Sequence, residues 1–410
     1  MSTASTPAHP DDGATGLEQL VSYDDFHRAA KARLDPMVYD YYRSGALREW
    51  TLAENERAWN RWVFRRRSMV DVSDIDVSTT VLGRRLSFPV LLAPTAFHRL
   101  ADPDGEVATA RAAAAVGTTM VASTLATVPL EDLAATGVSR WFQLYVFADR
   151  GLTRELVDRA AAAGYTALVP TVDTPTVGIR YADQRNRFVL PPGLEMANVM
   201  HALDPDLAES GSALRAFSAK FDQSLTWRDI EWLAGLSELP VVPKGVTHPD
   251  DAHAALAAGA AGVIVSNHGG RQLDGDPATA DALAGVVDAV GDSGLVLVDG
   301  GIRSGTDVVK ARALGAAAVL VGRSVLWALA AGGQAGVERM LTLLRDEVAD
   351  TLRQLGVLNR PGFHAHSVTS VPPSLRLHVQ RSGPPRIRPG VFAPGGASAG
   401  WCCTSAPSRR

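Results

Sequence analysis

The sequence predicts an α/β fold, a (β/α)8 TIM barrel, and two patterns carry that prediction. Eight short apolar runs recur along the chain, and amphipathic, alanine-rich stretches lie between them. Continuous apolar runs are typical of parallel strands covered on both faces, and eight repeats of strand and helix are the count for a closed barrel. The expected strands are residues 88–93, 120–123, 141–146, 167–172, 241–244, 263–266, 295–299 and 319–322.

Further segments surround this repeat. Residues 23–67 are expected to form two or three N-terminal helices, which either cap the bottom of the barrel or reach its catalytic face. The step after the fourth strand is much longer than the others, and residues 187–224 have the composition of a long loop over that face. Residues 336–355 show helical spacing of apolar side chains and predict the closing helix.

Composition limits the classes of function. With 410 residues, 46% of them hydrophobic, the chain can bury a large core. A net charge of -4 provides no basic field for nucleic acid. The two cysteines, Cys402 and Cys403, are adjacent, which is neither metal-ligand spacing nor a disulfide framework. The sequence shows no signal peptide and no apolar segment of ~18 residues, so we expect a cytoplasmic protein with a small-molecule ligand.

The C-terminal segment differs from the rest of the chain. Residues 351–410 contain eight Arg and no Asp or Glu, and residues 361–410 contain eight Pro. A segment of this composition buries too little apolar surface to fold. We therefore expect a disordered N-terminus at 1–20, a barrel domain at 21–358 and a disordered Pro/Arg-rich tail at 359–410.

Polar groups follow nearly every expected strand, at the end where barrel enzymes place their working residues. Glycine-rich residues 300–305 and 322–324 bring backbone N–H groups, Arg303 and Arg323 to the starts of helices, which is how a barrel holds phosphate. The alternative is two glycine turns with surface arginines. Lys244 is expected to bring a fixed positive charge into the barrel mouth, unless it is a solvated loop residue.

The stretch SNHGGRQLDG at 266–275 follows a buried strand but contains almost no core-forming side chains. A histidine can take up a proton near neutral pH, and an arginine offers a two-pronged donor to a carboxylate. His268 and Arg271 therefore predict a base beside a carboxylate clamp, and Asp173 is a candidate to hold the His268 ring. The alternative for His268 is a surface residue that only forms hydrogen bonds.

The chain resembles the FMN-dependent L-2-hydroxy acid oxidase and dehydrogenase family, which includes glycolate oxidase, lactate oxidase, mandelate dehydrogenase and hydroxymandelate oxidase. The resemblance covers residues 23–358. It rests on several motifs, among them VYDYYRSGA at 38–46, APTAFHRLADPDGE at 93–106, TVDTPTVGIRYAD at 171–183, SNHGGRQLDG at 266–275 and VDGGIRSGTDVVKARALGA at 298–316. It implies that FMN oxidises an L-2-hydroxy acid to a 2-oxo acid, and that O2 reoxidises the flavin and yields H2O2.

The resemblance also implies roles for individual residues. The catalytic positions fall on His268 as base, Asp173 as its orienting carboxylate, Arg180 and Arg271 as carboxylate-binding groups, and Tyr41 and Tyr145 as active-site tyrosines. The FMN contacts fall on Pro94, Thr95, Ala96, Ser123, Gln143, Thr171, Lys244, Ser266, Asp299, Gly301, Arg303, Gly322 and Arg323. Lys244 is then expected to stabilise negative charge on the reduced flavin.

Departures from the family pattern raise further expectations. Leu125 stands where glycolate oxidases carry a tryptophan, so we expect a substrate pocket that admits a larger or branched side chain. From Asn359 onward the sequence no longer matches, which indicates either a shifted reading frame or a diverged extension. A homo-oligomer, a tetramer or octamer, is expected from the resemblance.

Three alternatives in function stay open. The first is a quinone- or carrier-linked dehydrogenase, the second a different FMN barrel enzyme, and the third an inactive flavin-binding protein. The polar loop after the fourth strand favours an oxidase that does not anchor to a membrane.

Overall fold

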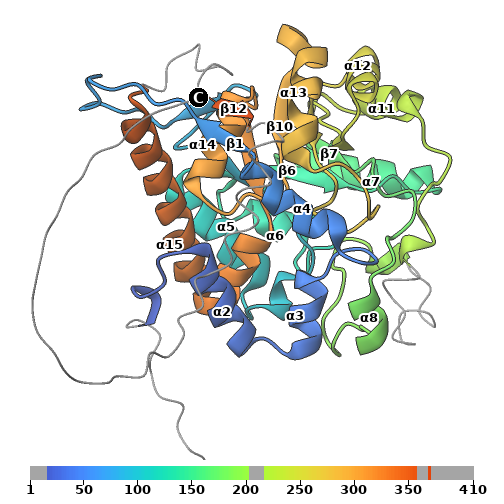
Figure 1. Cartoon of the computed structure of the whole chain (residues 1–410). Helices are drawn as coiled ribbons and strands as arrows, with labels where there is room; N and C mark the ends of the chain where they lie inside the picture. Colours follow the sequence, from blue (N-terminus) through green and yellow to red (C-terminus); the bar gives the residue numbers. More distant parts are fainter. Residues whose placement is uncertain (1–15, 203–216, 358–367, 371–410) are drawn as a thin grey trace, which may run out of the picture. The chain divides into compact units, whose positions relative to one another are not determined.

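The computed structural model describes residues 16–202, 217–357 and 368–370. Within these ranges, eight parallel strands form one sheet in the order β7-β6-β5-β4-β11-β10-β9-β8 (Figure 1). The strands are β4 (Val90–Leu92), β5 (Thr119–Ala122), β6 (Ser139–Leu144), β7 (Leu168–Pro170), β8 (Lys244–Val246), β9 (Gly262–Val265), β10 (Leu295–Val298) and β11 (Ala318–Val321). The predicted α/β barrel is confirmed.

The barrel closes between its first and last strands in the sheet order, β7 and β8. Leu168 forms a parallel bridge to Val241, and Thr171 forms one to Lys244. The fifth strand was expected at 241–244, but its regular ladder starts only at Lys244 and shifts register against β9. Pro243 explains this difference, because a proline has no N–H to donate to a ladder.

Helices surround the barrel and cover its outer face. They are α5 (Gly105–Val116), α6 (Leu130–Ala134), α7 (Arg150–Ala162), α8 (Tyr181–Asn186), α11 (Trp227–Ala234), α12 (Pro249–Ala257), α13 (Thr279–Val290), α14 (Gly305–Ala313) and α15 (Arg323–Leu355). The expected closing helix at 336–355 is the second part of α15, which is kinked at Gly332 and Gly333. No helix in the described ranges is long and apolar enough to span a membrane.

Two apolar layers result from the alternation of side chains along the barrel strands. Leu91, Ile264 and Leu320 belong to a buried cluster inside the barrel. Val90 and Leu92, which flank Leu91 in β4, pack instead into the larger cluster beneath the helices. Because successive strand residues point to opposite faces, a continuous apolar run fills both layers.

The helices α2 (Tyr23–Arg33), α3 (Pro36–Arg43) and α4 (Trp50–Trp59) precede the barrel in the described part of the chain. Side chains cap the first two, since Ser22 accepts from the Asp25 N–H and Asp35 accepts from the Met37 N–H. Figure 1 shows α3 beside α8, which follows the fourth barrel strand, and the two helices are in contact. Of the two expected placements, these helices therefore take the one that reaches the carboxyl ends of the strands.

A short hairpin of β2 (Thr79–Val81) and β3 (Arg84–Leu86) lies between these helices and β4 in the sequence. The side chains of Val81 and Leu86 join the apolar cluster inside the barrel. The hairpin therefore closes the barrel at the end opposite the carboxyl ends of its strands.

The structure describes short parts of the segments that were expected to be disordered or to form a long loop. Val368–Ser370 forms β12, which pairs antiparallel with β1 (Trp62–Phe64), so three residues of the expected disordered tail belong to a sheet. At the N-terminus, the Leu20 N–H donates to the Leu17 carbonyl within a turn. In the long loop, Met200–Ala202 forms a short 3-10 helix. Residues 1–15, 203–216, 358–367 and 371–410 lie outside the described ranges, and with them most of the two segments expected to be disordered.

Candidate active site

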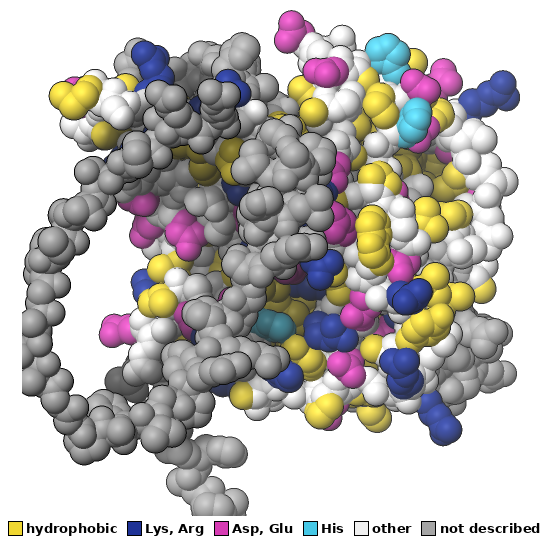
Figure 2. All heavy atoms as spheres, in the orientation of Figure 1, with side chains coloured by type: hydrophobic (Ala, Val, Ile, Leu, Met, Phe, Trp, Pro, Cys, Tyr) yellow, Lys and Arg dark blue, Asp and Glu magenta, His cyan; other side chains and the backbone are white. Residues whose placement is uncertain are grey.

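A cavity opens at the carboxyl ends of the barrel strands, with an empty volume of ≈ 1230 Å³ that includes its open mouth. Expected site residues that line it are Tyr41, Pro94, Thr95, Ala96, Ser123, Leu125, Gln143, Tyr145, Thr171, Arg180, Lys244, His268, Arg271, Asp299, Gly301, Arg303, Gly322 and Arg323. Asp173 and Ser266 lie behind this wall, in contact with His268 and Lys244. In Figure 2, basic and acidic side chains lie interspersed over α3 and α8.

His268 and Asp173 form a pair at the ends of two different strands. His268 Nδ1 lies 2.9 Å from Asp173 Oδ1. Because an ionised carboxylate only accepts hydrogen bonds, Nδ1 donates and the neutral ring keeps the lone pair on Nε2. Burial raises the pKa of Asp173, but His268 and Lys244 outweigh that effect, and its pKa lies below the ordinary value. The pair is therefore a base held in one tautomer by an ionised carboxylate.

The loop that carries His268 has an unusual backbone conformation. His268 has φ 57, a left-handed value that non-glycine residues seldom adopt. Asn267 and Asn55 of α4 exchange two side-chain hydrogen bonds of 2.8 Å each and hold the loop in place. A Cβ on Gly270, which has φ 73, would lie 2.5 Å from the Leu52 backbone nitrogen. The N-terminal helix α4 thus fixes the position of His268.

Two cationic side chains, Arg271 and Arg180, line the same cavity as His268. Arg271 Nη1 donates to the carbonyls of Tyr41 and Ser44 at 2.8 and 2.7 Å, which leaves the donors on Nε and Nη2 for a ligand or the Tyr41 hydroxyl. Arg271 and Arg180 lie over the Tyr41 ring, 5.2 and 5.6 Å from its centroid. Burial, with repulsion from Arg180 and Arg323, lowers the pKa of Arg271 to about 9. An anion bound here would relieve that repulsion.

The tyrosines are held by aromatic neighbours. Tyr41 stacks on Phe188 with ring centroids 4.1 Å apart, and Tyr145 stacks on Phe221 at 4.6 Å. Burial raises the pKa of both hydroxyls. Both tyrosines therefore remain hydrogen-bond donors at neutral pH.

Lys244 is buried at the end of the barrel interior. Its Nζ lies 3.1 Å from Asp299 Oδ2 and donates to Ser266 Oγ at 2.9 Å. Burial lowers the pKa of Lys244, but Asp299 and Asp173 outweigh burial and raise it above the ordinary value. Asp299 Oδ1 is buried without a partner in the part of the chain that the structure describes. A buried carboxylate oxygen without a donor at a cavity wall indicates a ligand with a hydroxyl or N–H group.

Polar side chains also link three neighbouring strand ends. Gln143 Nε2 donates to Thr171 Oγ1 at 2.9 Å, and Gln143 Oε1 accepts from the Thr124 N–H at 3.1 Å and from Ser123 Oγ at 3.3 Å. The side chains of Ser123, Gln143 and Thr171 are buried. This chain of hydrogen bonds gives the cavity a rigid polar wall.

The two glycine-rich loops lie at the ends of β10 and β11. Among the described residues, the N–H groups of Gly300, Gly301 and Ile302 donate no hydrogen bond. Gly301 has φ 76, and a Cβ there would lie 2.1 Å from the Asn55 carbonyl oxygen, so only glycine fits. The loop therefore offers free amides at the cavity wall, as an anion-binding loop does.

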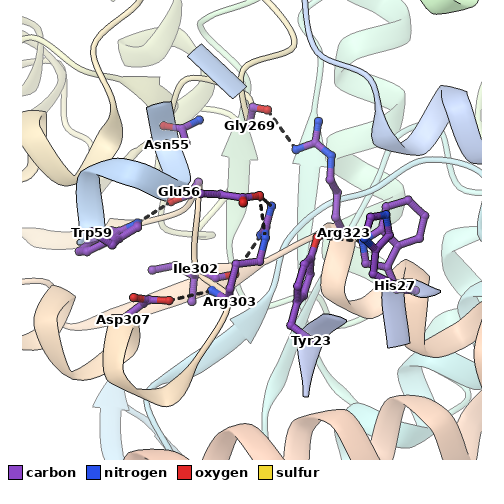
Figure 3. A network of polar contacts seen from close by, with 12 residues as sticks. Tyr23, His27, Asn55, Glu56, Trp59, Gly269, Ile302, Arg303, Asp307 and Arg323 are labelled. Atoms are coloured by element: carbon purple, nitrogen blue, oxygen red, sulfur yellow. Dashed lines mark hydrogen bonds and ion pairs between the residues drawn. The ribbon is translucent and has the colours of Figure 1, made fainter. Parts of the chain in front are cut away.

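Both arginines of these loops already contact the protein (Figure 3). Arg303 Nε and Nη2 donate to Glu56 Oε1 at 3.0 and 2.8 Å. Arg323 donates to three carbonyls, those of Tyr42, Ser44 and Gly269, at 2.9, 3.1 and 3.0 Å. Arg323 thus joins α3 to the His268 loop, a structural role that the sequence did not predict. Each guanidinium retains unused N–H groups, because it has five.

These features define a class of protein, an α/β-barrel enzyme with three groups around one cavity. They are the His268–Asp173 pair, a cationic wall formed by Arg180 and Arg271, and the anion-binding loop at residues 300–302. Comparison with known proteins identifies the family. A model described as FMN-dependent dehydrogenase matches residues 30–368. The chain belongs to the FMN-dependent dehydrogenase family, and its cofactor is FMN.

Individual relatives are similar over most of their length. L-lactate oxidase of Nostoc sp. is 50% identical over 350 residues, which cover 83% of this chain and 96% of that protein. Glycolate oxidase 1 of Zea mays is 50% identical over 345 residues, which cover 83% of this chain and 93% of that protein. A crystal structure of mandelate oxidase matches with a TM-score of 0.79 and 41% identity, over 86% of this chain and 99% of that one.

The cavity fits FMN on two observations of this structure. The free amides of Gly300, Gly301 and Ile302 suit a phosphate group. The unpaired Asp299 oxygen and the buried Lys244 ammonium suit the polar part of a flavin nucleotide. The backbone amides and the buried side chains at the cavity wall thus match the anionic and the polar parts of the cofactor respectively.

Several residues around the cavity were not predicted from the sequence. Val177, Phe217 and Phe221 line it, and Thr174 donates to Asp173 Oδ1 at 2.9 Å. Thr174 adjoins Asp173 in TVDTPTVGIRYAD, so its place in that motif was the available signal. No sequence signal pointed to Phe217 and Phe221, because they lie within residues 187–224, which have the composition of a loop.

Proposed function

We propose that the protein oxidises an L-2-hydroxy acid to the 2-oxo acid with FMN as its cofactor, and that O2 accepts the electrons and becomes H2O2. The observation that carries this proposal is that His268, which is paired with Asp173, lines the same cavity as Arg271 and Arg180. A base and two cations are what a substrate with a hydroxyl beside a carboxylate requires.

In this proposal the cationic wall binds the substrate. Arg271, through its donors on Nε and Nη2, and Arg180 bind the carboxylate. The Tyr41 hydroxyl adds a hydrogen bond, and Tyr145 provides a second protonated hydroxyl at the cavity wall. Fixing the carboxylate at two points orients the hydroxyl and the α-carbon before any bond breaks.

His268 takes the proton of the substrate hydroxyl on Nε2. The ring then carries a positive charge, and the Asp173 carboxylate stabilises it through Nδ1. Bound FMN supplies the acceptor for the two electrons of the α C–H bond. The overall balance is one hydroxy acid and one O2 converted to one 2-oxo acid and one H2O2.

We assign the cofactor contacts to the residues named from the resemblance. The loop amides with Arg303 and Arg323 would hold the phosphate of FMN, and Lys244 with Asp299 would hold polar groups of the flavin nucleotide. These assignments are supported by the lining of the cavity.

The substrate side chain is proposed to be larger than that of glycolate. Leu125, Val177, Phe217 and Phe221 form an apolar part of the cavity wall beside Tyr145. An apolar wall favours an apolar substituent by about 0.8 kcal/mol for each buried CH2 group. A branched or aromatic L-2-hydroxy acid therefore fits better than one without a side chain.

The electron acceptor is tested by product stoichiometry. In air-saturated buffer, an oxidase forms H2O2 and 2-oxo acid in equal amounts. Little peroxide together with a much higher rate on a quinone or dye acceptor would instead assign the carrier-linked dehydrogenase. The proposal also includes a homo-oligomer and a cytoplasmic location, for which light scattering and cell fractionation are the direct measurements.

A further inference from the structure

Arg303 lies in the cavity wall and is held by a carboxylate from another part of the chain. Glu56 belongs to α4, and its Oε1 accepts from both Nε and Nη2 of Arg303. Figure 3 shows the two side chains facing each other, with Glu56 reaching in from α4 and Arg303 from the loop after β10. The Arg303 side chain is 18% exposed and that of Glu56 49%. Arg303 is therefore enclosed, while its partner remains partly in solvent.

The donors of Arg303 can be counted. A guanidinium has five N–H groups: one on Nε and two on each Nη. Glu56 takes one from Nε and one from Nη2, and the Ile302 carbonyl takes one from Nη1 at 2.9 Å. One N–H remains on each Nη. These two form the end of the guanidinium fork, which can grip two oxygens of one phosphate.

The flat face of the guanidinium is also fixed. The Tyr23 ring of α2 lies 4.5 Å from the Arg303 guanidinium carbon, and the Tyr23 hydroxyl accepts from Trp327 Nε1 at 3.0 Å. Burial lowers the pKa of Arg303, but Tyr23 and Glu56 outweigh burial and raise it. Among the described residues no carboxylate forms an ion pair with Arg323, and burial with repulsion from Arg303 lowers the pKa of Arg323 to about 10.

We propose that Glu56 is a positioning residue for the cofactor, which with Tyr23 holds Arg303 so that the free end of its fork meets the phosphate of FMN. Glu56 itself does not touch FMN. The proposal rests on the cofactor of the family and on the phosphate contact assigned to Arg303, and it does not depend on which acid is oxidised.

Glu56 also has an electrostatic effect that opposes FMN binding. A carboxylate beside the phosphate site repels the phosphate and competes with it for Arg303, so its removal would tighten FMN binding. Glu56→Gln and Glu56→Ala separate the two effects. Glutamine retains an oxygen that accepts from both nitrogens but carries no charge, whereas alanine removes the acceptor and the charge together.

The experiment titrates apoprotein with FMN and, separately, with riboflavin, which has no phosphate, and reads binding from quenching of flavin fluorescence. Glu56→Ala is expected to weaken FMN binding about tenfold or more, the scale of one charge-assisted hydrogen bond, and to leave riboflavin binding unchanged. Glu56→Gln is expected to stay within about threefold of the wild type. Glu54→Ala is the matched control, because Glu54 lies on the same helix and pairs with Arg61 instead.

Three results would overturn the proposal. Equal weakening of FMN and riboflavin by Glu56→Ala would show a purely structural role. Tighter FMN binding by both variants would show that Glu56 competes with the phosphate. Unchanged FMN binding by Glu56→Ala would show that Arg303 does not need this partner. FMN binding by the wild type without oxidation of any hydroxy acid would contradict the proposed function and leave this inference intact.

Discussion

The replacement Asp173→Asn tests the electrostatic part of the mechanism. Asp173 Oδ1 lies 2.9 Å from His268 Nδ1, and the Asp173 side chain is 10% exposed. The charge that develops on His268 is then paired with a carboxylate whose centre lies about 4 Å away, which is worth about 4 kcal/mol at an effective dielectric constant of about 20. Asparagine keeps the volume and loses the charge. Proton removal by His268 should therefore slow by about 10³-fold.

The assay is stopped-flow reduction of bound FMN by the substrate under anaerobic conditions. We expect the limiting rate constant to fall while the substrate dissociation constant changes little, because Arg180 and Arg271 are untouched. Thr174→Val is the control, since it removes a hydroxyl that donates to the same carboxylate and should cost less than about tenfold. A limiting rate within about fivefold of the wild type in Asp173→Asn would refute the reasoning.

Three other predictions follow from the same geometry. His268→Gln should keep FMN and slow its reduction by about 10²–10⁴-fold, and near-normal reduction would place the base elsewhere. Lys244→Met should leave Asp299 buried and unpaired and lower the free energy of unfolding in urea by about 3–5 kcal/mol, so a loss below about 1 kcal/mol would contradict the described pair. Leu125→Trp should lower kcat/KM for L-mandelate more than for glycolate by about tenfold or more, and equal losses would remove Leu125 from the pocket.

The barrel could be predicted from the sequence because its signals are local. Most strands coincide with a short apolar run, and nearly every run is followed by a polar group at the catalytic face. The pairing that closes the barrel depends on β7 and β8, where Pro243 interrupts the ladder, and only the structure shows its register. The first part of α15 was missed because Gly332 and Gly333 break the helical pattern.

The candidate site was predicted unevenly, and the reason is distance along the chain. Lys244 lies in the barrel strand β8, and His268 and Arg271 lie in the loop after β9, so their placement in the cavity follows from the fold. Glu56 meets Arg303 across 247 residues, and no local pattern encodes that contact. The structural role of Arg323 could not be predicted for the same reason. Its three backbone acceptors come from α3, the turn that follows α3 and the His268 loop, all distant in the sequence.

The most direct measurement is anaerobic mixing of the purified, FMN-loaded protein with single enantiomers of 2-hydroxy acids. The account predicts that an L-2-hydroxy acid with an apolar side chain, L-mandelate or L-lactate, bleaches the visible absorbance of FMN and leaves the 2-oxo acid. It also predicts that the D-enantiomer does not. Absorbance that persists with glycolate and with every L-2-hydroxy acid in a panel up to L-mandelate would contradict the proposed function.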